Sequence, residues 1–379
     1  MVVRSLDINK DPFRPQEKDE EILGDETPYL SAIGALMYRA NNTRPDICFV
    51  VSLLAKFSSC PTRRHWKGAK HIFRYLQGTI DMDCCILMHP KCLNISHPPN
   101  VIVAKDGSEN YNTIMAAVFA SPNNSIAPYY IQIKQGIYEE YVQIDSWKTN
   151  IIFIGDGIDK TIITGNKSYG GGIGTYYTAT VGKASADFCT FYRCQFDSFQ
   201  DTVYAHRGKQ FYRECTILGT NDFICGDAIA VFQDCLIEMR KPIKGQYIVI
   251  TAQQRNDKTK PTGLVLQNCT LRLATPDAGD NVTMYLGRPW GNFSRTVIMN
   301  SYIDMLVNPR GWIEFEGMSR VQPYYLEYQN KGVGADIKRR VKWSSTTNDP
   351  RIVSNFTVRN FINGDKWIPS TVPHYLDLI

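Results

Sequence analysis

The sequence predicts an all-β fold, a coiled solenoid of short strands, preceded by a small helical segment. Three observations lead to this prediction. From residue 101 onward, short β-rich runs are broken by Gly, Asn and Asp. A motif recurs at a period near twenty, as FYRCQF from Phe191, FYRECTI from Phe211 and VFQDCLIE from Val231. Alternating βα units are disfavoured, because no helical run of adequate length separates these strands.

Length and composition set the outer limits. The 379 residues give room for two or three average domains, or for one solenoid with an appendage. With 43% hydrophobic and 21% charged residues, the composition excludes a disordered chain and a fibrous protein. The formal net charge of +5 would suit a polyanionic partner, but an excess of basic residues without a functional role explains it equally well.

Residues 1–89 are predicted to be helical, because apolar residues recur there at helical spacing. Residues 90–100 are punctuated by proline and are predicted to be a linker. His65 and His71 lie in a basic part of the helical segment, and we expect them on a solvated surface rather than at a metal site.

The repeat places three cysteines at equivalent positions. Cys194, Cys215 and Cys235 lie 21 and 20 residues apart. Each repeat of a solenoid buries its apolar face only against its neighbours, so these side chains are expected to form an inward ladder of small hydrophobic groups. Disulfide pairing between them is the less favoured alternative. The total of eleven cysteines is odd and includes no C-x-x-C pair, which argues against a complete disulfide framework and a zinc site.

Two aspartates follow the same repeat. Asp201 lies seven residues after Cys194, and Asp222 lies seven residues after Cys215. If one repeat is one coil, both side chains leave the same face of strands about 4.8 Å apart. Two close carboxylates do not both ionise easily, so one becomes a general acid beside a nucleophile or base. Spacing alone favours the alternative, in which both are turn residues at coil corners.

The surrounding motifs favour the catalytic interpretation. SFQDTVY (198–204), GTNDFICG (219–226) and YLGRPW (285–290) closely match active-site motifs of pectin methylesterases. Further matches follow in family order, from VIVAKDGSENYNTI (101–114) to FTVRNFINGDKWIPST (356–371). Residues 101–379 therefore resemble a plant pectin methylesterase (pectinesterase) catalytic domain. The resemblance implies a right-handed parallel β-helix, the pectin lyase-like solenoid.

The resemblance also implies an aspartyl esterase without metal or organic cofactor, which hydrolyses methyl esters of homogalacturonan to pectate and methanol in cell wall modification. Asp222 would attack the ester carbonyl, and Asp201 would act first as acid and then as base. Gln200 would hydrogen-bond the oxyanion, and Arg288 would bond to Asp222. The implied substrate-binding positions are Tyr204, Trp290, Tyr176, Cys225 and Phe315, the last two standing where the family has an aromatic residue and a Trp.

The sequence departs from the family at an apparent internal deletion near residues 183–185. After TYYTATVGK (175–183) the family continues through another coil or more, including a Gln-Ala-Val-Ala-Leu stretch whose Gln is a second oxyanion donor. Loss of one such donor typically costs about a hundred- to a thousandfold in rate. The alternative to an active enzyme is therefore a catalytically impaired, pectin-binding β-helix remnant. Asn221, before Asp222, also replaces an apolar residue or Thr.

Residues 1–89 resemble a different family. The runs PYLSAIGALMYRANNTRPDICFVVSLLAKFSS (28–59) and PTRRHWKGAKHIFRYLQGT (61–79) are similar to a copia-type retrotransposon polyprotein. The polymerase motif Tyr-x-Asp-Asp is absent, so we expect a remnant without chemistry and not a protein that acts on nucleic acid. A pectate lyase or a galacturonase would share the solenoid. Such an enzyme would need a calcium-binding acidic cluster or a different set of catalytic carboxylates, and the sequence contains no match to either.

The family resemblance implies secretion to the plant cell wall, with pectin as substrate and a proteinaceous pectinesterase inhibitor as a second partner. It implies no nucleic acid, no membrane and a monomer. The first twenty residues contain no apolar run that would serve as a signal peptide. The longest apolar stretch, 47–55, is too short to span a bilayer.

Overall fold

The computed structural model describes residues 98–379, except 166–178, 280, 306 and 318–321, together with isolated positions between residues 29 and 69. The chain forms two compact units, Met1–Asn94 and Ile95–Ile379, which are described separately. In the described residues there is no helix with both the length and the apolar character needed to cross a membrane.

In the first unit, the described residues are largely buried. The Tyr29 hydroxyl donates a hydrogen bond to the Leu54 carbonyl at 2.7 Å, and the Tyr29 ring packs edge-on against Trp66. His65 is fully buried, and the Thr62 amide donates to its Nδ1 at 3.1 Å. The expectation of a solvated His65 is therefore wrong, because a local turn supplies the ring with a polar partner. His71 lies outside the described residues.

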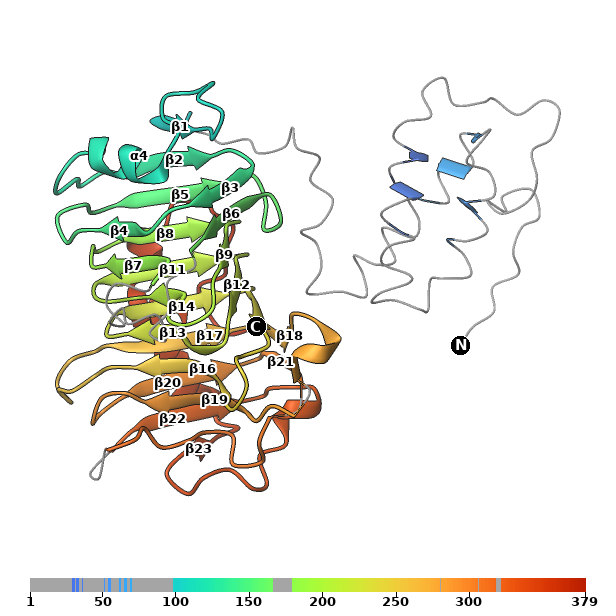
Figure 1. Ribbon diagram of the computed structural model, residues 1–379, viewed down its shortest axis with the longest axis vertical. Helices are drawn as coiled ribbons and strands as arrows, with labels where there is room; N and C mark the ends of the chain where they lie inside the picture. Colours follow the sequence, from blue (N-terminus) through green and yellow to red (C-terminus); the bar gives the residue numbers. More distant parts are fainter. Residues whose placement is uncertain are drawn as a thin grey trace. The chain divides into compact units, whose positions relative to one another are not determined.

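The second unit is a β-helix, a stack of coils in which each strand pairs in parallel with the corresponding strands of the coils before and after it (Figure 1). The described residues form three such sheets, of ten, seven and six strands. This arrangement confirms the all-β solenoid predicted from the repeat.

Within each sheet the strands follow one another in chain order along the stack. The ten-stranded sheet contains β1 (Val101–Val103), β2 (Tyr129–Ile133), β5 (Ile151–Gly155), β8 (Cys189–Tyr192), β11 (Lys209–Arg213), β14 (Ile229–Gln233), β17 (Gly263–Gln267), β20 (Arg295–Met299), β22 (Tyr324–Tyr328) and β23 (Ser345–Thr346). The seven-stranded sheet contains β3 (Gly136–Glu139), β6 (Thr161–Thr164), β9 (Gln195–Asp197), β12 (Thr216–Gly219), β15 (Leu236–Met239), β18 (Thr270–Leu273) and β21 (Tyr302–Asp304). The six-stranded sheet contains β4 (Val142–Ile144), β7 (Val181–Ala184), β10 (Val203–Tyr204), β13 (Asn221–Gly226), β16 (Ile248–Gln253) and β19 (Met284–Pro289).

Short helices accompany the strands in this unit. They are α4 (Ile114–Ala120), η4 (Pro276–Gly279), η5 (Val333–Ala335), α6 (Pro350–Val353), η6 (Ser354–Phe356), α7 (Val358–Ile362) and η7 (Gly364–Lys366). Thr113 caps α4 through its side chain, and the Glu140 carboxylate accepts hydrogen bonds from the first two amides of that helix.

The corner between the ten- and seven-stranded sheets repeats one backbone conformation. A residue with φ between 47° and 59° directly follows five consecutive strands of the ten-stranded sheet, β8, β11, β14, β17 and β20, at Arg193, Glu214, Asp234, Asn268 and Asn300. The residues that follow include the predicted ladder of Cys194, Cys215 and Cys235, which Cys269 and Ser301 extend, and all five are at most 2% exposed. The cysteines of the ladder are unpaired, which confirms core packing over disulfide formation.

A stack of aromatic rings fills the core beside this ladder. Phe153, Phe191, Tyr212 and Phe232 come from consecutive strands of the ten-stranded sheet and are fully buried. Their ring centroids are 4.7, 5.1 and 4.4 Å apart, with interplanar angles of at most 11°. Each coil thus supports the next through an apolar contact that the parallel register repeats.

We expect Phe191→Ala to lower the free energy of unfolding of the second unit by about 3–5 kcal/mol, because it leaves a ring-sized cavity between two stacked aromatic side chains. Urea unfolding followed by circular dichroism measures this change. Phe119→Ala is the control, because its side chain is 83% exposed, and we expect a change within about 0.5 kcal/mol. Equal effects of the two substitutions would contradict the role of the stack.

The stack is continuous around the apparent deletion near residues 183–185. β5 pairs directly with β8, and β6 pairs directly with β9. β7 lies between β4 and β10, with Val181 opposite both Val142 and Val203. The coils on either side of this point therefore stack directly on each other, with a register shift between Gln143 and Ile144 where β4 pairs with β7.

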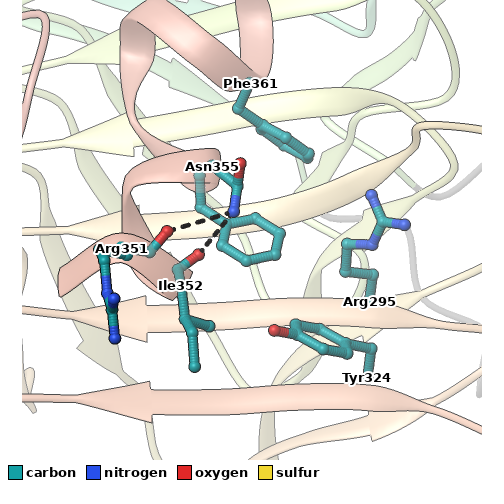
Figure 2. A pocket seen from close by; sticks show the side chains of 7 residues that line it. Arg295, Tyr324, Arg351, Ile352, Asn355 and Phe361 are labelled. Atoms are coloured by element: carbon teal, nitrogen blue, oxygen red, sulfur yellow. Dashed lines mark hydrogen bonds between the residues drawn. The ribbon is translucent and has the colours of Figure 1, made fainter. Parts of the chain in front are cut away.

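The C-terminal segment lies over the ten-stranded sheet. The side-chain amides of Gln233 and Gln267 donate to the Tyr375 and Asp377 carbonyls at 2.9 and 3.0 Å. Near β20 and β22 the C-terminal helices leave a cavity of about 470 Å³. Figure 2 shows the residues that line it, which are Arg295, Tyr324, Arg351, Ile352, Asn355, Phe356 and Phe361. None of the candidate catalytic or substrate-binding residues from the sequence analysis is among them.

Candidate active site

The two aspartates of the repeat lie on adjacent coils of the six-stranded sheet. β10 pairs with β13 so that Val203 is opposite Ile224, which places Asp201 beside Asp222. The Asp201 amide donates to the Asn221 carbonyl at 3.3 Å. Strands that pair in this way are about 4.8 Å apart. The prediction of equivalent positions on neighbouring coils is confirmed.

Both aspartates have the same unusual backbone conformation, with φ of 53° at Asp201 and 52° at Asp222. Short polar side chains tolerate this left-handed region better than most residues. The pairing of β13 with β16 also shifts register between Asn221 and Ile224. Such a bulge bends a strand and redirects a side chain, which separates Asp222 from the regular alternation of β13.

Arg288 on β19 binds Asp222 through two nitrogens. Its Nε donates to Oδ1 at 2.8 Å and to Oδ2 at 3.1 Å, and its Nη2 donates to Oδ2. The two side chains are only 11% and 10% exposed, so water screens the pair weakly. The bond that the family resemblance implied for Arg288 is present.

Burial and pairing act on this carboxyl in opposite directions. Burial raises the pKa of Asp222 above its ordinary value, while the hydrogen bonds and the charge of Arg288 lower it. For Arg288, burial lowers the pKa, but Asp222 outweighs burial and the pKa of the guanidinium rises. The arginine thus stays charged and favours the ionised carboxylate.

Two aromatic residues contact the guanidinium of Arg288. Its Nη1 donates to the Tyr247 hydroxyl at 3.0 Å, and its Cζ lies 4.5 Å from the centroid of the Phe315 ring. The resemblance implies that Phe315 binds substrate, and in the structure its ring also contacts Arg288. Sequence analysis missed Tyr247, which stands in no motif and outside the repeat.

Three of the implied substrate-binding residues come together. These are Tyr204, Cys225 and Trp290. Tyr204 and Cys225 belong to one buried cluster, which also contains Ala252, and Trp290 packs against this cluster. The Tyr204 and Trp290 ring centroids are 6.0 Å apart. Tyr176, the remaining aromatic position implied by the resemblance, lies outside the described residues.

Cys225 contacts Asp201. Its Sγ donates to the Asp201 Oδ1 at 3.8 Å. Burial, and then the charges of Asp201 and Asp222, hold the pKa of the Cys225 thiol well above its usual range. The thiol therefore keeps its proton and remains a hydrogen-bond donor to the carboxylate.

Gln200 immediately precedes Asp201 and is half-buried. No hydrogen bond joins its side-chain amide to another residue that the structure describes. The neighbouring Asn221 has a buried Oδ1 without a partner among the described residues. The described residues contain no group of three or more His, Cys, Asp or Glu that could hold a metal ion.

The arrangement supplies the groups that acyl transfer requires. Asp222, held by Arg288, is a candidate nucleophile, and Asp201 on the neighbouring coil is a candidate acid and base. The Gln200 amide is a candidate donor to an oxyanion. Tyr204 and Trp290, which pack in the cluster that contains Cys225, are the aromatic candidates for substrate binding.

Comparison with known families gives matches over the second unit. A family model described as "Pectinesterase" matches residues 100–189 and 182–365. "Putative pectinesterase/pectinesterase inhibitor 28" of Arabidopsis thaliana is 43% identical over 314 residues, which are 74% of this chain and 43% of that protein. "Pectinesterase 2" of Citrus sinensis is 41% identical over 313 residues, 74% of this chain and 61% of that protein. The chain spans about half the length of the curated relatives it matches.

Solved structures match the same part of the chain. "Pectin methylesterase from Carrot" is 38% identical, with a TM-score of 0.66, and the match covers 74% of this chain and 98% of that chain. A crystal structure of the pectin methylesterase from Aspergillus niger, in deglycosylated form, is 26% identical, with a TM-score of 0.56, and covers 72% and 96%.

Proposed function

This chain belongs to the pectinesterase family, and we propose that it hydrolyses methyl esters of homogalacturonan to pectate and methanol. The observation that carries the proposal is the buried Asp222 carboxylate, bound by Arg288 and adjacent to Asp201 on the next coil. We further propose that the protein acts as a monomer in the plant cell wall, with pectin as substrate and a proteinaceous inhibitor as a second partner. The pectinesterase and pectinesterase inhibitor names of the relatives support pectin as the substrate and an inhibitor as a partner.

The proposed reaction has two steps. In the first, an Asp222 oxygen attacks the ester carbonyl carbon, and the oxyanion accepts a hydrogen bond from the Gln200 amide. The bond to methoxide then breaks, and Asp201 gives its proton to the departing oxygen, which leaves as methanol.

In the second step, Asp201, now ionised, takes a proton from water. The hydroxide formed attacks the acyl carbon, the bond to Asp222 breaks, and the galacturonate carboxylic acid is released. Asp201 keeps the proton and Asp222 is ionised again, so both are ready for the next turnover. Arg288 stabilises the ionised form of Asp222 at the start and end of the cycle.

We propose that one coil has been lost near residues 183–185. The two segments of the family match overlap at residues 182–189, which supports this position. The direct pairing of β5 with β8 explains how the coils stack without the missing one. Of the two glutamines that donate to the oxyanion in the family, Gln200 would then be the one that remains. The second candidate function, a catalytically impaired pectin-binding remnant, follows from this loss.

Residues 1–89 are proposed to be a retrotransposon-derived remnant that takes no part in the reaction, joined through a linker at residues 90–100. The compact unit Met1–Asn94 and the start of the family match at residue 100 are compatible with these bounds.

The products distinguish this function from other reactions on pectin. Purified full-length chain is expected to release methanol and titratable carboxylate in equal amounts from highly methylated pectin. It is expected to form no unsaturated ends and no new reducing ends, and to leave fully de-esterified polygalacturonate unchanged. Chain cleavage without methanol would instead support a lyase or a galacturonase.

We expect Arg288→Gln to move the acidic limb of kcat/KM to higher pH by about one to three pH units. Asp222 attacks in its ionised form, burial raises its pKa, and Arg288 is the group that lowers it. Without the guanidinium, a higher pH is needed to ionise the carboxyl. The pH profile of methanol release measures the shift, with Arg310→Gln as the control because Arg310 is exposed and pairs with Glu314. An unchanged limb in Arg288→Gln would refute the role of the pair.

A further inference from the structure

We propose that Tyr247 is a positioning residue of this active site, whose hydroxyl fixes the orientation in which Arg288 binds Asp222. Tyr247 is half-buried in the segment just before β16. The inference rests on the proposed esterase function and adds to it a residue outside the active-site motifs.

The hydrogen bonds of Arg288 support this role. Nε and Nη2 donate to the Asp222 carboxylate, and Nη1 donates to the Tyr247 hydroxyl at 3.0 Å. Each of the three guanidinium nitrogens therefore has a partner. Because the guanidinium is planar, an anchor at Nη1 fixes the plane that contains the two nitrogens bound to Asp222.

Packing around the guanidinium supports the same role. The Arg288 Cζ lies 4.5 Å from the Phe315 ring centroid and 5.9 Å from the Tyr247 ring centroid. The Tyr247 ring packs edge-on against Tyr285 on β19, with centroids 5.9 Å apart at 87°. Tyr285 is only 9% exposed, so the ring of Tyr247 rests on a well-packed neighbour. The hydroxyl is thus held at a fixed position relative to the strand that carries Arg288.

Other titratable groups also face the Asp222–Arg288 pair. Asp201 and Cys225 lie on the side of the carboxylate, while Tyr325 on β22 and the exposed Glu316 interact with the charges of the pair. Burial raises the pKa of Tyr325 and of Cys225, so both are neutral. A substitution at Tyr247 leaves these groups in place, so any shift in the pKa of Asp222 can be assigned to the lost hydroxyl.

The test compares Tyr247→Phe with Tyr302→Phe in the full-length chain. Tyr247→Phe removes the acceptor of Nη1 and keeps the ring. We expect kcat for methanol release to fall about tenfold with KM nearly unchanged, and the acidic limb of kcat/KM to move to higher pH. Tyr302→Phe removes the hydroxyl of an exposed tyrosine on β21, in the seven-stranded sheet, and we expect the wild-type pH profile.

Carbon NMR titration of the Asp222 carboxyl, assigned with Asp222→Asn, gives a second readout that needs no turnover. The pKa of Asp222 is expected to be higher in Tyr247→Phe than in the wild type. An unchanged pKa and an unchanged acidic limb would overturn the inference, even if kcat falls. A wild-type chain that releases no methanol would contradict the proposed function, and the NMR titration would still decide the role of Tyr247.

Discussion

Asp222→Asn is expected to lower kcat for methanol release by about ten-thousandfold or more. An amide has almost no nucleophilicity towards an ester, so the acyl-enzyme cannot form. Asparagine has nearly the shape of aspartate, and it can still accept a hydrogen bond from Arg288. The loss therefore reports on chemistry more than on packing. Initial rates of methanol release at saturating methylated pectin measure it.

Asp304→Asn is the matched control for this substitution. Asp304 is an exposed aspartate on β21, in the seven-stranded sheet, and we expect wild-type activity. Circular dichroism and urea unfolding establish that both variants are folded. Retention of more than about a hundredth of the wild-type rate in Asp222→Asn would exclude Asp222 as the nucleophile.

The second large effect is expected for Asp201→Asn, a loss of about a hundred- to ten-thousandfold in kcat on the methyl ester. Asparagine cannot give a proton to the departing methoxide, nor take one from water. The control for folding is Cys225→Ala, which removes only the thiol that donates to Asp201 Oδ1. We expect this variant to lose far less activity than Asp201→Asn.

A trifluoroethyl ester of polygalacturonate separates the two roles of Asp201. Trifluoroethoxide leaves without a proton more readily than methoxide, so acylation no longer needs the acid. Asp201→Asn is then expected to release a burst of trifluoroethanol equal in moles to the protein. Slow turnover follows the burst, because the base for the second step is still missing. The same loss on both esters, without a burst, would contradict the acid–base assignment.

The fold and the carboxylate pair could be predicted because both follow the repeat. In a stack of parallel coils, residues at the same offset from a repeated core position share a register, and Asp201 and Asp222 share the offset of seven from Cys194 and Cys215. Side chains at equivalent positions of consecutive coils therefore lie next to each other. Arg288 could not be placed by spacing, and it was assigned by its motif alone.

The surroundings of Arg288 could not be predicted, because they come from segments outside the repeat. Tyr247 precedes β16 after an irregular stretch, and it lies 41 residues from Arg288 in the chain. Phe315 follows β21 in another irregular segment, and the contact of its ring with Arg288 could not be predicted from its motif. Cys225 was identified as a departure from the family, but its contact with Asp201 depends on the register of β10 and β13.

This pair of carboxylates is proposed to form a working esterase despite the proposed loss of a coil near residues 183–185. The most direct test is methanol release from highly methylated pectin by the purified, folded full-length chain, beside Asp222→Asn. We predict saturable release by the wild type and none above background by the variant. No release from a folded wild-type chain, or equal release by both, would contradict the proposal and leave a pectin-binding β-helix without turnover.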